Sequence, residues 1–248
     1  MQLECFSVPY AAVEQMRLLY REEAHCQIVH DSILRRELAN AFLFHADGAP
    51  AGYGGVWHKH YPGRIMEFYT LPSMRTAAAD MFELFISTSG AVEMEAQSNM
   101  PRMLDMLLAF CDNIQSDIIL YHDAVNTHIS RPDCSLVKQS EWSGEIFAHQ
   151  HEPVGEWLLI AEGKAAATGG ALHHYNPPYA DIYMETDEHL RCRGYASFLI
   201  QELKRKCYEI GKIPSARSDA SNKASRLAMQ KAGMLPCGRL AHGTLRTR

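Results

Sequence analysis

The chain contains 248 residues, of which 47% are hydrophobic and 21% are charged, and its 29 acidic and 24 basic side chains give a formal net charge of −5. This composition is typical of a globular protein with a substantial core, and it excludes a disordered or fibrous chain. The slight acidity argues against a protein whose main task is to neutralise nucleic-acid phosphates, so we expect no nucleic-acid partner.

No stretch resembles a targeting or membrane segment. Residues 1–20 carry Glu4 and Glu14 and lack a basic start followed by an apolar run, and no window approaches about 18 consecutive apolar residues. We therefore expect no membrane partner. The chain has seven cysteines, an odd number without any C-x-x-C pair, which disfavours a disulfide framework and a structural zinc site. The sequence thus predicts a reducing, cytoplasmic setting.

An internal repeat divides the chain. Ala46-Asp47-Gly48, followed by Gly54-Gly55, is matched roughly 115 positions later by Ala161-Glu162-Gly163, followed by Gly169-Gly170. Ser98-Asn99 is matched about 123 positions later by Ser221-Asn222. The two shifts differ because loops of different length separate the copies, so we expect two related lobes.

Hydrophobic periodicity predicts the same elements in both copies. The first copy adds amphipathic helices near residues 11–20 and 31–39. It then has strands at 42–46 and 65–71, a helix at 76–87, a strand at 91–96 and a helix at 100–111. After a polar linker at 123–133, the second copy has strands at 157–161 and 180–186, a helix at 196–212, a strand at 213–217 and a helix at 223–232. In each copy the Gly-Gly pair lies on the strand that returns from a hairpin.

These patterns predict an α/β fold with a mixed sheet in each of two tandem lobes. We expect the lobes to occupy residues 1–126 and 127–248.

The most informative segment joins the strand at 180–186 to the helix that follows. Gly194 stands at the bend, Ala196 and Ser197 are small, and Arg191 and Arg193 add positive charge. Such a loop turns backbone N–H groups toward one point, and the start of a helix adds its own unpaired donors and partial positive charge. This combination predicts a diphosphate-binding loop. It matches neither G-x-G-x-x-G nor G-x-x-x-x-G-K-[ST].

The loop reads Arg191-Cys192-Arg193-Gly194-Tyr195-Ala196, which has the form [Q/R]-x-x-G-x-[G/A]. Asn222 then begins a helix that ends in Lys231-Ala232-Gly233. In these two features the region from 157 to 238 resembles the GNAT superfamily of acyl-CoA-dependent N-acyltransferases. The first lobe is similar to that family only through the internal repeat. The resemblance implies tandem GNAT-like lobes, acetyl-CoA as cosubstrate and an amine as acceptor.

The resemblance also implies roles for particular residues. Backbone groups of Met184, Glu185 and Thr186 would pair with the pantetheine arm of CoA, as an added strand pairs with a sheet edge. Arg191, Cys192, Arg193, Gly194, Tyr195, Ala196 and Ser197 would hold the diphosphate, and Asn222 and Ser225 would contact the pantetheine. The alternative is that Gly194 only bends a strand-to-helix connection and that both arginines are solvated.

The first copy differs at the corresponding positions. Alignment of Arg75 with Arg191 places Ala78 where Gly194 stands and Asp80 where Ala196 stands. Ala78 lacks the backbone freedom of glycine, and a carboxylate beside a phosphate is repelled. We therefore expect the first lobe to be a degenerate copy that does not bind CoA and that serves as scaffold and as one wall of the acceptor site.

The sequence leaves the catalytic groups open. Met229 stands at the position where the superfamily commonly has a tyrosine proton donor, so Tyr183, Tyr195, a histidine or water would protonate the thiolate, or it leaves as an anion. Asp181 and Glu185 lie on the strand before the loop and are the candidate bases. His173 and His174 are rivals to them.

Two histidine pairs raise the question of a metal. The pairs His58/His60 and His149/His151 each place two imidazoles on one face of a strand, but no third or fourth ligand has a helpful spacing. We therefore expect no metal. Cys192 is either a thiol of lowered pKa or a tolerated small residue.

The leading interpretation is an acetyl-CoA-dependent N-acetyltransferase acting on the primary amine of a small-molecule acceptor, with the second lobe active. A non-catalytic acyl-CoA-binding or regulatory module is the alternative, because Met229 cannot donate a proton and no base is obvious. Transfer from aminoacyl-tRNA is disfavoured by the acidic charge. The acceptor and the oligomeric state have no signature in the sequence.

Overall fold

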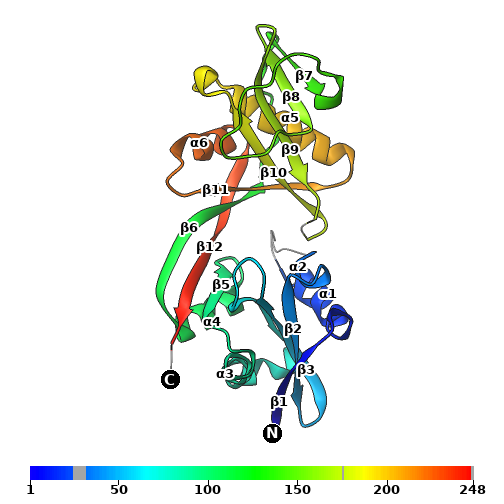
Figure 1. Cartoon of the computed structure of the whole chain (residues 1–248), viewed down its shortest axis with the longest axis vertical. Helices are drawn as coiled ribbons and strands as arrows, with labels where there is room; N and C mark the ends of the chain where they lie inside the picture. The colour runs from blue at the N-terminus through cyan, green and yellow to red at the C-terminus, as the bar shows by residue number, and fades with distance from the viewer. Residues whose placement is uncertain (25–31, 175, 247–248) are drawn as a thin grey trace. The chain divides into compact units, whose positions relative to one another are not determined.

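The computed structural model describes residues 1–24, 32–174 and 176–246. The chain forms two compact units (Figure 1). The first unit comprises Met1–Asp117 and Gly238–Arg248, and the second comprises Ile118–Cys237. Residues 118–126 and 238–248 are therefore grouped differently from the lobes expected at 1–126 and 127–248.

The first unit has a mixed sheet with helices packed against it. Its elements are β1 (Leu3–Val8), η1 (Tyr10–Ala12), α1 (Glu14–Glu22), α2 (Ser32–Arg35), β2 (Ala39–Ala46), β3 (Ala49–Trp57), β4 (Arg64–Thr70), η2 (Pro72–Ala77), α3 (Ala78–Ser89), β5 (Glu93–Gln97) and α4 (Pro101–Phe110). Strands β1 to β4 pair antiparallel in chain order, and β5 pairs with β4 in parallel.

The second unit repeats this plan. Its elements are β7 (Cys134–Lys138), η3 (Gln139–Glu141), β8 (Trp157–Ala161), β9 (Lys164–Leu172), β10 (Tyr179–Thr186), η4 (Glu188–Leu190), α5 (Tyr195–Glu209), β11 (Ile213–Asp219) and α6 (Lys223–Lys231). Strands β7 to β10 pair antiparallel, and β11 pairs with β10 in parallel. The predicted α/β class with two repeated lobes is confirmed.

The last strand of each sheet follows the last helix of the other copy. Strand β6 (Cys111–Asp123) follows α4, but its residues Ile118–His122 pair with β11 of the second unit. Strand β12 (Met234–Leu245) follows α6, but its residues Leu240–Thr244 pair with β5 of the first unit. This pairing explains why the C-terminal segment is grouped with the first unit, and simple alignment of the two copies did not predict it.

The repeated glycines have the same structural cause in both copies. Each hairpin turns on an acidic residue and a glycine with positive φ, which matches the twist of the flanking strands: Asp47 (49°) with Gly48 (78°), and Glu162 (52°) with Gly163 (72°). The first glycine of each Gly-Gly pair lies under a helix. A Cβ on Gly54 would lie 2.4 Å from the ring of Phe85 on α3, and a Cβ on Gly169 would lie 2.8 Å from Leu203 on α5.

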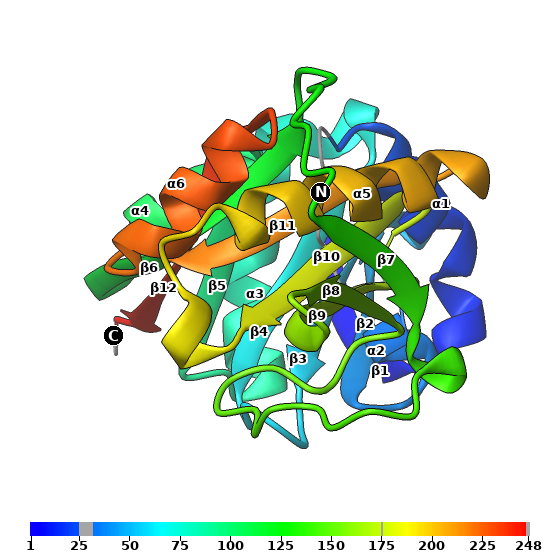
Figure 2. The same ribbon diagram turned by 90° about the horizontal axis from the view of Figure 1, so that it is seen from above.

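The helices of the second unit cover one face of its sheet (Figure 2). Helix α5 packs on β9, β10 and β11 and against α6. The residues of α5 buried there recur at three- and four-residue spacing and include Leu199, Ile200, Leu203 and Cys207, whereas the helix ends at Glu209, short of the predicted residue 212. They meet Ala180 and Ile182 of β10, so the alternate residues of that strand face away from α5.

The local predictions need correction in two respects. The helix expected at 31–39 is a single turn, α2, because Ala39 already pairs with Trp57 in the β2–β3 ladder; Asp31 itself lies outside the described residues. In addition, strands β1, β6, β7 and β12 were not predicted. No helix in the described part of the chain is long and apolar enough to cross a membrane.

Candidate functional site

Strands β10 and β11 separate at their carboxyl ends. Their parallel pairing runs from Tyr179↔Ile213 to Ile182↔Ala216 and stops there. Both strands nevertheless continue, since β10 stays paired with β9 as far as Thr186 and β11 stays paired with β6 as far as Asp219. Residues 183–186 and 217–219 therefore turn their inner backbone groups toward an opening between two central strands. Unpaired strand edges of this kind can accept an extended ligand.

The predicted anion loop lies beyond the end of β10. Cys192 and Gly194 have φ values of 63° and 85°, a left-handed conformation that is unusual for cysteine. Gly194 is the N-cap of α5, and no side chain caps the helix there. The backbone N–H groups of Tyr195, Ala196 and Ser197 thus begin a 15-residue helix without intrahelical partners. Unpaired backbone N–H groups at the start of a helix can bind an anion, so binding of a diphosphate here stays a prediction.

Arg131 completes the loop and was missed by the sequence analysis. Its guanidinium donates to the carbonyl of Arg193 at 2.6 Å and lies 4.4 Å from the centre of the Tyr195 ring. Arg191 and Arg193 are exposed, and Arg193 is 3.7 Å from Glu162. Three arginines therefore surround the bend at Gly194. The third comes from a segment about 60 residues earlier, and no local pattern connects the two.

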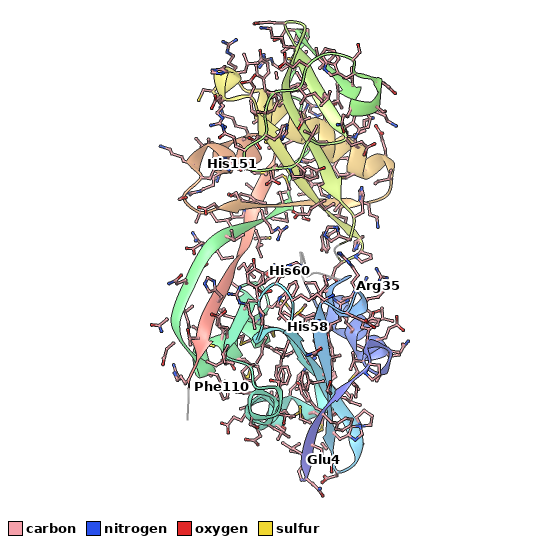
Figure 3. The ribbon with its side chains drawn as sticks, viewed as in Figure 1. Glu4, Arg35, His58, His60, Phe110 and His151 are labelled. Carbon is pink, nitrogen blue, oxygen red and sulfur yellow. The ribbon has the colours of Figure 1, made fainter. Side chains whose placement is uncertain are left out.

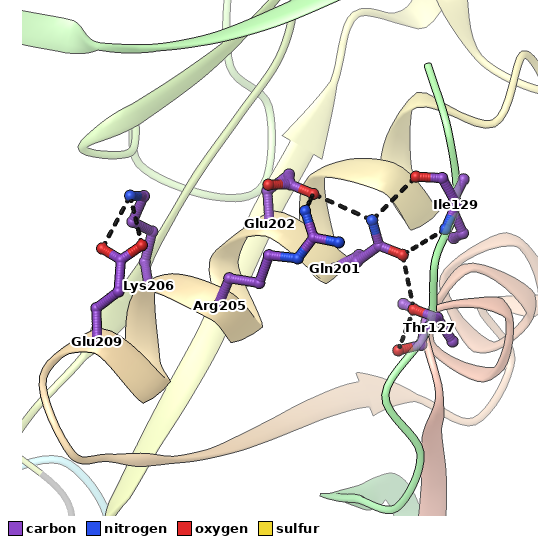
Figure 4. Close-up of polar contacts among 8 residues, drawn as sticks. Thr127, Ile129, Gln201, Glu202, Arg205, Lys206 and Glu209 are labelled. Atoms are coloured by element: carbon purple, nitrogen blue, oxygen red, sulfur yellow. Dashed lines mark hydrogen bonds and ion pairs between the residues drawn. The ribbon is translucent and has the colours of Figure 1, made fainter. Parts of the chain in front are cut away.

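Helix α5 holds the segment that carries Arg131 (Figure 4). The buried amide of Gln201 accepts from Thr127 Oγ1 at 2.9 Å and from the Ile129 N–H at 2.6 Å, and it donates to the Ile129 carbonyl at 3.0 Å. Lys204, also buried, donates to the Val125 carbonyl at 2.7 Å. The stretch predicted as a linker is thus fixed along the helix, which positions Arg131 two residues beyond Ile129.

Thr186 supplies an unsatisfied group at the predicted cofactor site. Its hydroxyl oxygen is buried and has no hydrogen-bond partner among the described residues. Met184 and Thr186 share the face of β10 that carries Ile182, and Met184 packs against the core beneath α5. An orphaned buried hydroxyl at the open end of β10 fits a polar ligand group better than it fits a closed core.

Asn222 and Ser225 lie at the start of α6. The side chain of Asn222 accepts the backbone N–H of Ser225 at 3.0 Å and so acts as the N-cap. This structural role is sufficient reason for an asparagine at that position. Contact with pantetheine stays a prediction for both residues.

Asp181 is the buried carboxylate of β10. It is 4% exposed, and its Oδ2 accepts from Arg217 Nε at 3.0 Å and from Arg217 NH2 at 2.8 Å. Its Oδ1 has no partner within the described chain. Burial raises the pKa of Asp181 to about 6, even though Arg217 lowers it. Arg217 is the first residue of β11 beyond the paired region, so the ion pair lies where the two strands begin to separate.

Glu185, the other candidate base, anchors a loop instead of offering a free carboxylate. It accepts the N–H groups of Gln150, His151 and Glu152 at 3.0, 3.0 and 2.9 Å. Burial raises its pKa, but these three donors more than offset burial and hold the pKa below its ordinary value. A carboxylate held ionised by three donors is a poor proton acceptor.

We expect Glu185→Gln to lower the free energy of unfolding by about 2–3 kcal/mol, because the amide replaces a charged acceptor of several N–H groups. Since the folded pKa is depressed, the stabilisation by Glu185 is present above the unfolded pKa of about 4.3 and is lost as the pH falls through the lower, folded pKa. Urea unfolding at pH 7 and pH 4 measures both effects. The control is Glu188→Gln, whose partly exposed carboxylate is 3.4 Å from the side chain of Gln150; equal losses in the two variants would contradict the anchoring role.

The histidine pairs do not have the predicted geometry. His58 and His60 follow the end of β3, and His151 lies in the loop before β8 (Figure 3). His149 lies in that same loop, so neither pair is on a strand. His149 is 3.1 Å from Thr168 Oγ1 and 2.8 Å from the Glu152 carbonyl. Among the described residues, no group of three or more histidine, cysteine or acidic side chains could hold a metal ion.

Met229 is 3% exposed and belongs to the core beneath the opening. The same cluster contains Tyr121 of β6, whose side chain is fully buried and whose hydroxyl is 3.3 Å from Ser218 Oγ. Ser218 lies on β11 two residues beyond its last pairing with β10. Tyr183, by contrast, has its hydroxyl over Gly170 of β9, on the side away from β11. The sequence analysis did not single out Tyr121, because β6 precedes the predicted second lobe in the chain.

The first unit lacks the anion loop. Strands β4 and β5 also separate early, after Ile65↔Met94. Residues 72–77, however, form the 3-10 helix η2, and none of residues 72–80 has a positive φ. Asp80 lies in the first turn of α3, where a bound phosphate would meet its carboxylate. The two units therefore differ at the loop and resemble each other in the sheet.

Comparison with known proteins agrees with this geometry. Residues 120–234 match the Acetyltransferase (GNAT) family model. No curated protein sequence is similar enough to be identified as a relative.

Solved structures with similar folds include a GNAT-family acetyltransferase from Colwellia psychrerythraea (TM-score 0.76, 14% identity, 99% of this chain and 100% of that chain). A tandem GNAT protein from the clavulanic acid biosynthesis pathway has a TM-score of 0.59 at 12% identity over 100% of both chains. A GCN5-related N-acetyltransferase from Sphaerobacter thermophilus has a TM-score of 0.58 at 16% identity over 99% of this chain and 96% of that chain. The second unit thus belongs to the acetyltransferase (GNAT) family, and the chain as a whole has the fold of tandem GNAT proteins.

Proposed function

We propose that the second unit transfers the acetyl group of acetyl-CoA to the primary amine of a small-molecule acceptor. The observation that carries this proposal is the opening between β10 and β11, which ends beside the uncapped start of α5. In the proposal the loop around Gly194 holds the diphosphate, and the inner backbone groups of residues 183–186 bind the pantetheine arm. When bound, acetyl-CoA supplies the activated acyl group.

Asp181 is the general base in this proposal. Its raised pKa keeps most of the carboxylate ionised at neutral pH while leaving it a stronger proton acceptor than an exposed aspartate. Its unpartnered Oδ1 is the atom that accepts the proton from the acceptor ammonium, directly or through water. Arg217, bonded to Oδ2, orients the carboxylate. Glu185 positions the loop that covers the same face of β10.

Tyr121 is the proton donor to the departing thiolate. Met229 cannot donate, Tyr195 lies beneath Arg131, and the Tyr183 hydroxyl lies over β9. The Tyr121 hydroxyl accepts a hydrogen bond from Ser218, beyond the point where β11 leaves β10, and Tyr121 belongs to the same buried cluster as Met229.

We expect Tyr121→Phe to lower kcat about tenfold with little change in KM for acetyl-CoA. The effect is modest because a thiol with a pKa near 8.5 already leaves as an anion without much assistance. Steady-state release of CoA thiol measures it, with Tyr183→Phe as the matched variant. A loss confined to Tyr183→Phe would assign the donor to β10 instead.

The second candidate is a non-catalytic acyl-CoA-binding module, which the methionine at position 229 favours. Titration with acetyl-CoA followed by an assay of thiol release with a panel of primary amines separates the two. Turnover of any amine supports the enzyme, whereas tight binding without turnover of any amine supports the module.

We also propose that the protein is cytoplasmic. Six cysteines within the described residues are free thiols, as in a reducing compartment.

A further inference from the structure

The first unit contains a pocket at the position that corresponds to the cofactor site of the second unit. It has a volume of about 150 Å³ and lies between the end of β4, the start of α3, and α4. Phe68, Ala78 and Met106 form its apolar wall, and Arg75, Arg102 and Asp105 carry its charges. By the internal repeat, Ala78 corresponds to Gly194 and Met106 to Met229. The pocket is thus built from the elements that bind CoA in the proposed function, but with other side chains.

This pocket does not suit CoA. The loop that would face a diphosphate is the helix η2, and Asp80 adds a negative charge to the first turn of α3. A cavity of this size holds a body of about six carbon atoms, because an engineered cavity of about 150 Å³ in another protein binds benzene. The ligand must therefore be smaller than CoA, and the charged groups at the opening of the pocket indicate its chemical class.

A carboxylate from the protein itself already occupies an anion site beside the pocket. Glu23, directly after α1, accepts hydrogen bonds from the Tyr69 hydroxyl at 3.0 Å and from Arg75 NH2 at 2.6 Å, and also from Arg102 NH1. These three donors come from β4, η2 and α4. The buried Nε of Arg75 has no acceptor among the described residues. The two arginines that line the pocket can thus hold a carboxylate and have a donor to spare.

We propose that this pocket binds a small organic carboxylate, whose apolar body lies against Phe68 and Met106 and whose carboxylate takes the place of Glu23 between Arg75 and Arg102. The ligand carries one negative charge, because the exposed side chain of Asp105 opposes a second one at the same mouth. Glu23 is an internal competitor that a ligand must displace. A monocarboxylate fits better than phosphate, because the group now bound there is itself a carboxylate.

Calorimetric titration of the full chain with benzoate tests the proposal without any enzyme assay. We expect Glu23→Gln to bind benzoate at least fivefold more tightly than the unchanged protein, since the competing charge is gone. Adding Arg102→Gln to that variant should weaken binding at least tenfold. Asp105→Asn should also tighten benzoate binding. This variant leaves the contacts of α1 intact, so it replaces Glu23→Gln in the titration if Glu23→Gln does not fold.

Two comparisons make the ligand class testable. Inorganic phosphate should bind more weakly than benzoate, and saturating acetyl-CoA should not displace benzoate, because the two ligands occupy different units. Absence of saturable benzoate binding in both folded variants, tighter binding of phosphate, or displacement by acetyl-CoA would each overturn the proposal. Because the titration measures binding to the first unit, its result is independent of whether the second unit transfers acetyl groups.

Discussion

Gly194→Glu is expected to weaken acetyl-CoA binding by at least a hundredfold while the second unit stays folded. Gly194 has a φ of 85°, which costs a residue with a side chain about 1–2 kcal/mol. A carboxylate about 4 Å from a phosphate charge adds on the order of 4 kcal/mol at an effective dielectric near 20. Among the described residues, and apart from its chain neighbours, a Cβ placed there comes within 4 Å of Arg131 Nη1 alone, at 3.5 Å, so the new side chain meets no packed core.

Gly211→Glu is the matched control for this variant. Gly211 lies just beyond the other end of α5, has a φ of 68°, and has no atom within 4 Å of an added Cβ. The two substitutions therefore impose a similar backbone cost and differ in whether they touch the loop. Isothermal titration of both variants with acetyl-CoA measures the difference. Equal affinities would remove the loop around Gly194 from the cofactor site.

Asp181→Asn is expected to reduce kcat by about 10²–10⁴-fold, the usual contribution of a general base. In the unchanged enzyme the rate should fall as the pH drops below about 6, because Asp181 becomes protonated there. The residual activity of the variant should not show this acidic decline. Thiol release with the most reactive amine of the panel measures both. The comparison variant is Glu152→Gln, which alters a neighbouring carboxylate; a larger loss in Glu152→Gln would transfer the role of base to Glu152.

The same variant should be more stable than the unchanged protein. Because the pKa of Asp181 is about 6 in the folded state and near 3.9 in the unfolded state, the folded protein holds the extra proton between these values. Ionisation of Asp181 therefore costs stability, and that cost develops as the pH rises from about 4 to 6.

We expect Asp181→Asn to gain about 1–3 kcal/mol in the free energy of unfolding at pH 7 and nothing at pH 4. Arg217, which loses its contact with Asp181, is partly exposed and can be solvated there. Urea unfolding at the two pH values checks this expectation. A loss of stability at pH 7 would show that the Asp181–Arg217 ion pair stabilises the fold. It would then contradict the idea that Asp181 is a catalytic base whose ionisation destabilises the protein.

The features that the sequence predicted are those encoded locally. The Asp47-Gly48 and Glu162-Gly163 hairpins, the Gly-Gly pairs and the amphipathic pattern of α5 each follow from a few neighbouring residues, and together they identified both copies and the fold. The loop at Gly194 was predicted in the same way, because a bend, small residues and a helix start are adjacent in the chain.

The features that the sequence did not predict depend on contacts between distant residues. Arg131 reaches the loop only because Gln201 binds the backbone of Ile129. Glu185 resembles Asp181 in the alternation of β10, yet the amides of residues 150–152 make it an anchor and leave Asp181 as the candidate base. The strand exchange depends on which sheet edge β6 and β12 reach, and hydrophobic periodicity carries no information about that choice.

The two units show how one sheet supports different chemistry. Both separate their central parallel strands, but the second follows its strand with a left-handed loop and the first with a 3-10 helix and an acidic first turn. The difference in cofactor binding that we propose therefore lies mainly in the connection between the strand and the helix, whereas the shared sheet places the opening.

In the proposed function the second unit alone binds the cofactor. Calorimetric titration of the full chain with acetyl-CoA measures how many equivalents bind. We predict saturation at one equivalent per chain, with that single site lost in Gly194→Glu. Saturation at two equivalents, or no binding by the unchanged protein, would contradict the account.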